Sequence, residues 1–151
     1  MTRTTTMDTK MSKIYLTGAV SDWDDPFAWH DSVASDYPDH EFVNPYELND
    51  FELGDDEVHE RPNEIVDPAE EAIESCDGMI ARWDDDAFLV GSAMEIKHAF
   101  EHDVPVVIWY DGWRDDLSPW LLEKSRGNFE DRDQCLKVLL ALIGEPVHGY
   151  S

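Results

Sequence analysis

Short apolar runs alternate along most of the chain with segments in which apolar residues recur at helical spacing. Residues 13–18 form a β-rich run that ends in a glycine, and residues 104–109 are almost continuously apolar. A continuous apolar run is typical of a parallel strand covered on both faces. We predict further strands at 41–45, at 77–83 and, as a brief edge strand, at 127–129.

Helical spacing separates these strands and predicts the fold class. The expected helices cover residues 26–35, 63–76, 118–122 and 131–143, with one more opening near residue 93; Asp25 is expected to cap the first of them. Strands alternating with helices predict an α/β three-layer sandwich around a mostly parallel five-stranded sheet of the flavodoxin or Rossmann-like kind. Ligands of such folds bind beyond the carboxyl ends of the strands, which selects the loops 17–25, 44–61, 83–92 and 110–118.

One stretch, residues 88–100, combines a loop of small residues with an amphipathic helix. Ala93, Ile96, Ala99 and Phe100 are predicted to form the buried stripe, with Glu95 beside it in the first helical turn. Free backbone N–H groups and the helix dipole favour an ionised carboxylate there by roughly 0.3–1 kcal/mol. Such a position suits a nucleophile, although a glutamate in a first turn is more often a favourable charge or half of a capping box.

Length and cysteine content indicate the class of protein. The 151 residues fit one domain, which we place at 13–151 after a polar, loose leader at 1–12. Two cysteines, Cys76 and Cys135, are too few for a disulfide framework, and no signal peptide or long apolar run is present. We therefore expect a soluble, reduced, cytoplasmic protein without a membrane partner.

The charge balance is extreme, with 35 acidic against 11 basic residues and a formal net charge of −24. Such a chain repels nucleic acid and anionic membranes, so neither is an expected partner. It is either an acidic protein that mimics DNA or solvates a partner, or a protein adapted to a salt-rich cytoplasm, where counterions screen the repulsion. We favour a halophilic origin, because the acidic residues are spread over the whole chain and six tryptophans with five tyrosines indicate a packed core.

The sequence lacks the motifs of several common chemistries. Neither GxGxxG nor a lysine-bearing phosphate loop occurs, which argues against ATP and NAD chemistry, and we expect no cofactor. His98 and His102 lie four residues apart, but a histidine pair on a solvated helix face is more often a surface feature than a metal site. No metal ligand is therefore predicted.

Three groups of residues carry a resemblance to the nucleoside 2-deoxyribosyltransferase family, spanning most of residues 13–109. They are the first strand at 13–18, Asp67 ahead of 72–78, and Gly91-Ser92-Ala93-Met94-Glu95-Ile96 followed by the strand at 104–107. The resemblance implies that Glu95 is a nucleophile that attacks C1′ of a 2′-deoxynucleoside and forms a glycosyl-enzyme ester. A second base or water would then resolve this ester with net retention.

The resemblance also implies roles for other residues. Asp67 matches the family aspartate that gives a proton to the leaving base, and Tyr15 matches a tyrosine that orients the nucleophile. Relatives usually form homo-oligomers whose sites are completed across subunits. Tryptophans are suited to stacking on a nucleobase, and an acidic side chain after the third strand is suited to the sugar hydroxyl. The expected substrate-binding residues are Gly18, Trp23, Trp83, Asp86, Gly91, Ser92 and Met94.

Two departures from the family pattern leave the reaction open. Leu89 stands where transferases commonly have aspartate and the related 5′-monophosphate N-hydrolases have serine, and Lys97 replaces a helix glycine. We therefore consider a deoxyribosyltransferase acting on nucleosides and an N-glycosidase acting on deoxynucleoside 5′-monophosphates. The glycosidase needs cations near the phosphate, for which Arg82, Lys97 and Arg114 are available. The third possibility is a non-catalytic nucleotide-binding or acidic interaction protein.

Overall fold

Five parallel strands form one sheet in the computed structural model, which describes residues 11–20, 25–48, 60–87 and 89–144. The order across the sheet is β2-β1-β3-β4-β5, and every neighbouring pair is parallel. The strands are β1 (Lys13–Gly18), β2 (Glu41–Val43), β3 (Gly78–Trp83), β4 (Val106–Tyr110) and β5 (Gly127–Phe129). The predicted α/β fold with a parallel five-stranded sheet is confirmed.

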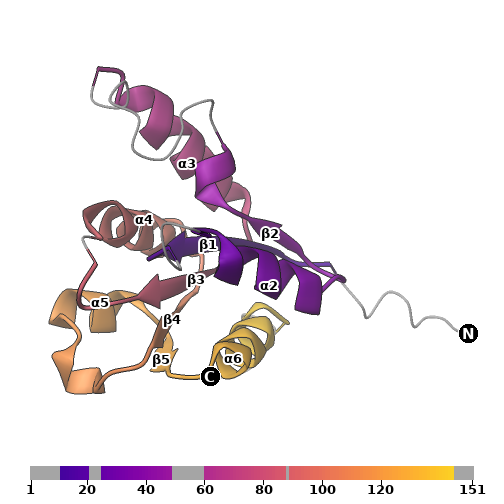
Figure 1. Ribbon diagram of the computed structural model, residues 1–151, viewed down its shortest axis with the longest axis vertical. Helices are drawn as coiled ribbons and strands as arrows, with labels where there is room; N and C mark the ends of the chain where they lie inside the picture. The colour runs from indigo at the N-terminus through magenta and orange to yellow at the C-terminus, as the bar shows by residue number, and fades with distance from the viewer. Residues whose placement is uncertain (1–10, 21–24, 49–59, 88, 145–151) are drawn as a thin grey trace, which may run out of the picture.

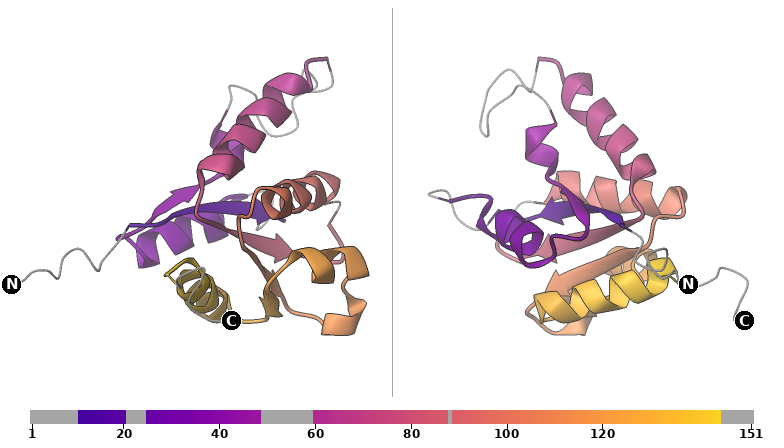
Figure 2. Two further views of the ribbon diagram at one scale, coloured as in Figure 1. Left: turned by 180° about the vertical axis from the view of Figure 1, so that it is seen from behind. Right: turned by 90° about the vertical axis from the view of Figure 1, so that its right-hand side faces the viewer.

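Helices cover both faces of this sheet, as Figures 1 and 2 show. One face carries α3, α4 and α5, and the other carries α2 and α6. The helices are α2 (Ala28–Asp36), α3 (Asn63–Ser75), α4 (Val90–Glu101), α5 (Pro119–Lys124) and α6 (Arg132–Gly144), with short 3₁₀ helices η2 (Pro45–Glu47) and η4 (Arg114–Asp116). The N-terminal part of α3 extends away from the sheet in both figures.

Strand alternation divides the core into two layers. Successive side chains of a strand point to opposite faces, so Ile14 and Leu16 pack on the α2 and α6 side, whereas Tyr15 faces α3 and α4. The same alternation sends Met79 and Ala81 of β3 toward α4. Thr17 shares the parity of Tyr15, so both side chains lie on the α4 face near the carboxyl end of β1.

The sheet reverses its direction of winding between β1 and β3, which makes their carboxyl ends the expected ligand site. The two strands approach closely there. Gly18 has φ +118°, and a Cβ at this position would lie 2.1 Å from the carbonyl oxygen of Arg82. The next residue, Ala19, donates its N–H to that oxygen at 2.9 Å. A glycine is therefore required where the two strands meet.

Most predicted elements are confirmed, with small shifts at their ends. The clearest error is the start of α2, which begins at Ala28 with Phe27 in the capping position and no side-chain cap, so Asp25 does not cap it. Asp25 instead accepts the N–H of Ala28 through its carbonyl oxygen. Ser12, assigned to the leader, is buried, and its N–H donates to His40. Residues 1–10 lie outside the described part.

Cys76 and Cys135 are both buried free thiols. Burial raises the pKa of the Cys76 thiol to about 11 and that of Cys135 to about 12. Neither is therefore primed as a nucleophile at neutral pH. Within the described residues, no helix is both long enough and apolar enough to span a membrane.

Candidate functional site

Glu95 lies in the second turn of α4, not in the first as the sequence predicted. The helix already begins at Val90, with Leu89 in the capping position, so Gly91 and Ser92 belong to the helix and not to a loop. The free N–H groups of the first turn therefore cannot stabilise the Glu95 carboxylate. The buried positions of α4 are Ser92, Ile96 and Ala99, whereas Phe100, predicted to be buried, is 45% exposed.

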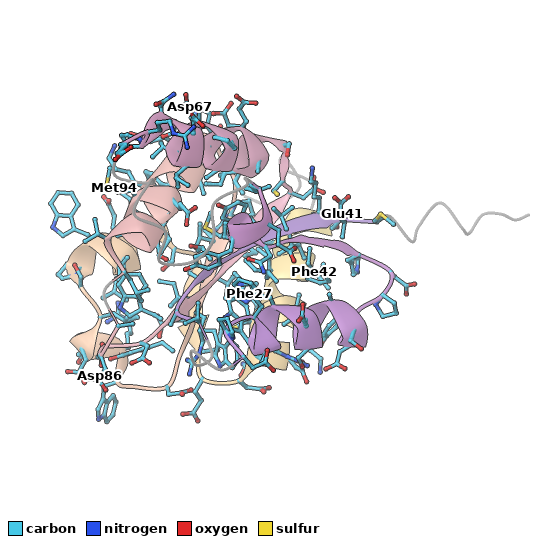
Figure 3. The ribbon with its side chains drawn as sticks, turned by 45° about the horizontal axis from the view of Figure 1, so that its top comes forward. Phe27, Glu41, Phe42, Asp67, Asp86 and Met94 are labelled. Carbon is cyan, nitrogen blue, oxygen red and sulfur yellow. The ribbon has the colours of Figure 1, made fainter. Side chains whose placement is uncertain are left out.

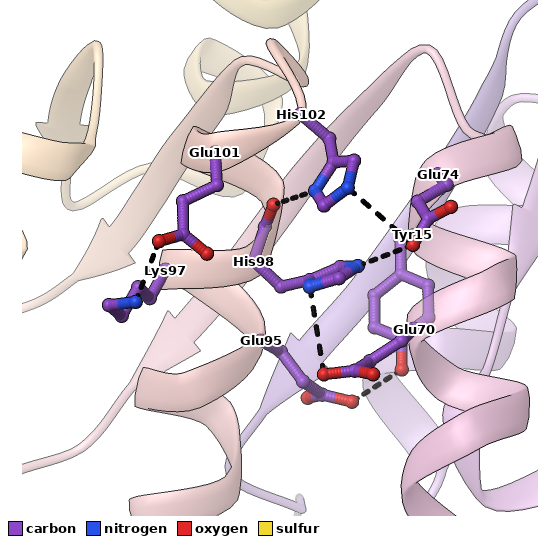
Figure 4. A network of polar contacts seen from close by, with 8 residues as sticks. All are labelled: Tyr15, Glu70, Glu74, Glu95, Lys97, His98, Glu101 and His102. Carbon is purple, nitrogen blue, oxygen red and sulfur yellow. Dashed lines mark hydrogen bonds and ion pairs between the residues drawn. The ribbon is translucent and has the colours of Figure 1, made fainter.

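Two hydroxyl groups of β1 hold the Glu95 carboxylate. Tyr15 donates to Oε2 at 2.5 Å, a contact drawn in Figure 4, and Thr17 donates to Oε1 at 2.5 Å. Each carboxylate oxygen thus has one donor, which fixes the orientation of the side chain. Hydrogen bonds to an ionised acceptor are short and strong. The fixed carboxylate stands at the carboxyl end of β1, beside the point where the sheet reverses.

Burial dominates the electrostatics of this carboxylate. It raises the pKa of Glu95, while the hydrogen bonds from Thr17 and Tyr15 partly offset that rise by favouring the ionised form. Burial and the charge of Glu95 raise the pKa of the Tyr15 phenol far above its usual range. Tyr15 therefore stays protonated and remains a donor at any physiological pH. A poorly solvated carboxylate with fixed donors is suited to nucleophilic attack.

Thr17 is a site residue that was not identified from the sequence. Besides donating to Glu95, its hydroxyl lies 3.1 Å from the Ser92 hydroxyl, which is buried one helical turn before Glu95. Ser92, expected to bind substrate, therefore supports Thr17 from within the core. The parity of Tyr15 and Thr17 on one strand was a signal that could have identified Thr17.

Tyr46 supplies an aromatic ring close to the carboxylate. It belongs to η2 just after β2, and burial together with the charge of Glu95 raises the pKa of its phenol. Its ring stacks on Phe27 at 5.4 Å between centroids, and it remains 37% exposed. The pair offers a partly open aromatic face of the kind that stacks on a nucleobase. The sequence analysis did not single out either residue.

The two expected acidic partners of Glu95 lie far from each other. Asp67 is exposed on α3, and Asp86 is exposed in the turn after β3, where its N–H donates to Asp84. Figure 3 shows them at opposite ends of the molecule. The roles expected of Asp67 and Asp86 therefore stay separate predictions. Asp67 comes from the helix that packs against α4, whereas Asp86 does not.

The remaining expected binding residues differ in their surroundings. Trp83 is partly buried against the α4 layer of the core, so packing accounts for much of its surface. Gly91 and Met94 are exposed, and a Cβ at Gly91 would meet no atom within 4 Å. Trp23 lies outside the described residues. Leu89 is half-buried at the start of α4.

The three cations considered for a phosphate all have acidic partners. Arg82 pairs with Asp111 at 3.1 Å and lies over the Trp109 ring, while Lys97 pairs with Glu101 and Arg114 with Asp115. By strand alternation Arg82 also points away from the face that carries Tyr15 and Thr17. None of the three is an unpaired cation directed at Glu95.

Comparison with known proteins supports the fold. No family model and no curated protein matches the sequence. A conserved protein from Enterococcus faecalis V583 has a similar structure with a TM-score of 0.69 and 16% identity, covering 88% of this chain and 99% of its own. A 2-deoxyribosyltransferase from Bacillus psychrosaccharolyticus gives a TM-score of 0.65 and 19% identity, covering 93% of this chain and all of its own. A CMP N-glycosidase from Clostridium botulinum gives 0.55 and 13%, covering 85% and 98%.

These likenesses extend over nearly the whole length of each neighbour. At such low identity they concern the fold, and they agree with the resemblance noted from the sequence. Two of these neighbours are named by activity, one as a 2-deoxyribosyltransferase and the other as a CMP N-glycosidase.

Proposed function

We propose that this protein is a nucleoside 2-deoxyribosyltransferase-like enzyme that cleaves the N-glycosidic bond of 2′-deoxynucleosides with Glu95 as nucleophile. The observation that carries the proposal is the half-buried Glu95 carboxylate, held by hydroxyls of Tyr15 and Thr17 at the reversal point of the sheet. Its fold is that of a 2-deoxyribosyltransferase and a CMP N-glycosidase, which adds support.

The reaction follows from the chemistry of a carboxylate nucleophile. A Glu95 oxygen forms a bond to C1′ while the bond from C1′ to the base nitrogen breaks, and the electron pair leaves with the base. Asp67 is the proposed source of the proton that the base takes up. A second base, or water, then attacks C1′ from the opposite side, gives its proton to the Asp67 carboxylate and releases Glu95, so the two inversions give net retention.

Tyr15 and Thr17 are proposed to position the nucleophile. Each donates to one carboxylate oxygen and leaves the second lone pair of that oxygen available for attack. Ser92 supports Thr17 in this role. The stacked pair of Tyr46 and Phe27 is the proposed surface for the base. Substrate contacts by Gly18, Trp83 and Met94 remain predictions.

Nucleosides are favoured over 5′-monophosphates as substrates. Arg82, Lys97 and Arg114 already pair with acidic side chains, and Leu89 offers no polar group to the sugar. A phosphate dianion placed in this strongly acidic protein, with these three cations already paired, would be repelled. Transfer and hydrolysis differ only in the acceptor of the second step, which makes the acceptor the variable to test.

A homo-oligomer is the proposed assembly. Several large apolar side chains of α4 and α5 are exposed, and Lys124 lies over the rings of both Phe100 and Trp120. The exposed apolar residues on these two helices are Val90, Met94, Phe100 and Trp120. Large exposed apolar side chains are frequent at protein interfaces. A salt-rich cytoplasm as the working environment remains a prediction.

The test is incubation of the protein at high KCl with a 2′-deoxynucleoside, with and without a second free base. An exchanged nucleoside supports transfer, and free deoxyribose supports hydrolysis. Glu95→Ala is expected to abolish either product, whereas Glu101→Gln, a change on the same helix at an exposed ion pair, serves as the matched control. Turnover that survives Glu95→Ala would exclude Glu95 as the nucleophile. Binding of nucleosides without turnover in the parent would favour the non-catalytic alternative.

A further inference from the structure

Helices α3 and α4 pack against each other and bring four ionisable side chains together. Glu70 and Glu74 lie four residues apart on α3, and His98 and His102 lie four residues apart on α4. Residues at this spacing share one helix face. Figure 4 shows the two pairs facing each other across the space between the helices. The sequence pattern alone had connected neither carboxylate with the histidines.

The distances within this group suit a small cation. Oε2 of Glu74 lies 2.8 Å from Nε2 of His98 and 3.7 Å from Nε2 of His102. The three residues each offer one ligand atom within 4.8 Å of the others. Tetrahedral bonds of about 2.0–2.2 Å place neighbouring ligand atoms about 3.4 Å apart. Small side-chain movements are therefore enough to surround one ion.

The outer nitrogens of the two rings have partners of the kind that metal-bound histidines use. Nδ1 of His102 lies 2.9 Å from the carbonyl oxygen of His98, an acceptor that places the ring proton on Nδ1. The Nε2 lone pair of His102 then faces Glu74. Nδ1 of His98 lies 3.6 Å from a Glu70 carboxylate oxygen. Backbone carbonyls and carboxylates on the second ring nitrogen fix the tautomer in metal sites.

This arrangement leaves lone pairs of Glu74 and His102 directed toward each other. Two acceptors at that distance repel unless a cation lies between them, and either a proton or a metal ion can serve. A metal ion can satisfy Glu74, His98 and His102 at once, whereas a single proton joins only two of them. Glu74 and His102 are 45% and 42% exposed, so an ion can enter from solvent and keep water in a fourth position.

We propose that Glu74, His98 and His102 bind one divalent transition-metal ion of the Zn²⁺ class, with Glu70 orienting His98. Two imidazoles and one carboxylate favour Zn²⁺, Co²⁺ or Ni²⁺ over Mg²⁺ or Ca²⁺, which prefer oxygen ligands. The bound ion joins α3 to α4. Glu95 lies one helical turn before His98, so the ion also fastens the helix that carries the candidate nucleophile. The proposal of this site does not rest on the proposed reaction.

The strongly acidic surface is a competing explanation for any metal uptake, so the experiment separates the two. The untagged, full-length protein is freed of metal with a chelator and titrated with Co²⁺ in the presence of millimolar Mg²⁺. Visible absorption bands report four- or five-coordinate Co²⁺ with nitrogen ligands. The expected result is one equivalent of bound Co²⁺ that stoichiometric Zn²⁺ displaces, together with a higher melting temperature of the protein in Zn²⁺.

Three variants make the test specific. His102→Gln changes an exposed ring at the end of α4 and is expected to weaken Co²⁺ binding at least about 100-fold, and Glu70→Gln by about tenfold or more. Glu71→Gln removes an equally acidic, exposed side chain from α3 and is expected to leave the affinity unchanged. Should His102→Gln fail to fold, Glu74→Gln takes its place. The proposal would be overturned if His102→Gln, or Glu74→Gln in its place, bound Co²⁺ as tightly as the parent. It would also be overturned if Glu71→Gln lost as much Co²⁺ affinity as that variant.

Discussion

The Thr17 hydroxyl is expected to set the pH at which the enzyme loses activity. It donates to Oε1 of Glu95 at 2.5 Å and favours the ionised carboxylate, whose pKa burial raises. In Thr17→Val the side chain keeps its shape but loses this donor. The pKa of Glu95 then rises further, so the nucleophile becomes protonated at a higher pH. The acid limb of the kcat/KM profile moves to higher pH accordingly.

The size of this change follows from the strength of the bond. A hydrogen bond to a charged group contributes about 1.5–3 kcal/mol, and 1.36 kcal/mol corresponds to one pKa unit. The acid limb is therefore expected to move up by about one to two pH units. Tyr15 still donates to Oε2, so the change is a displacement of the profile and not its loss.

The assay is the rate of base release from a 2′-deoxynucleoside between about pH 4 and 9 at constant high KCl. Thr17→Ser is the matched control, because it keeps the hydroxyl and is expected to retain the parental acid limb. A Thr17→Val variant that folds, turns over and shows an unmoved acid limb would refute the assignment of the limb to Glu95. An equal displacement in Thr17→Ser would point to packing, not to the hydrogen bond.

Three further changes have expected outcomes. Glu95→Gln should raise the free energy of unfolding at neutral pH, measured by urea denaturation. Burial raises the pKa of Glu95, so the stability that its carboxyl group contributes is present at low pH and is lost as pH rises through the native pKa. A destabilised variant would contradict this. His30 is 2% exposed with no hydrogen-bond partner for either ring nitrogen among the described residues, and burial lowers its pKa to about 4. Stability should therefore fall as pH drops from 6.5 toward 4, by about 2 kcal/mol at pH 5, and His30→Phe should flatten that part of the profile. Gly18→Ala should lower the free energy of unfolding by about 2–4 kcal/mol, seen as a lower urea midpoint. The reason is that φ at Gly18 is +118° and a methyl group there would lie 2.1 Å from the Arg82 carbonyl oxygen. Gly91→Ala is the control, because a Cβ at Gly91 would meet no atom within 4 Å.

The sheet was predictable because its signals are local. Apolar runs bounded by turn residues identified all five strands, and the alternation with helices gave the parallel topology. The start of α4 was misjudged because Leu89 and Val90 resemble the end of a loop, although the helix begins at Val90 with Leu89 in the capping position. A hydrophobic pattern does not fix the ends of a helix to the residue.

The site was only partly predictable for the same reason. Glu95 and Tyr15 were identified together from a resemblance, and they do contact each other. Thr17 was missed although its parity with Tyr15 predicts a shared face. The contacts of Glu74 with two histidines depend on how α3 packs against α4, which no local spacing encodes. Asp67 was expected from the resemblance and Asp86 from its place after the third strand, and the fold separates them.

The central claim is that Glu95 forms a covalent ester with the sugar. The most direct measurement is mass spectrometry of the protein quenched during turnover of a 2′-deoxynucleoside, followed by peptide mapping. The account predicts a deoxyribosyl adduct on the peptide that contains Glu95 in the parent protein, and neither adduct nor turnover in Glu95→Gln. Turnover with the adduct on another residue, or undiminished turnover in Glu95→Gln, would contradict it.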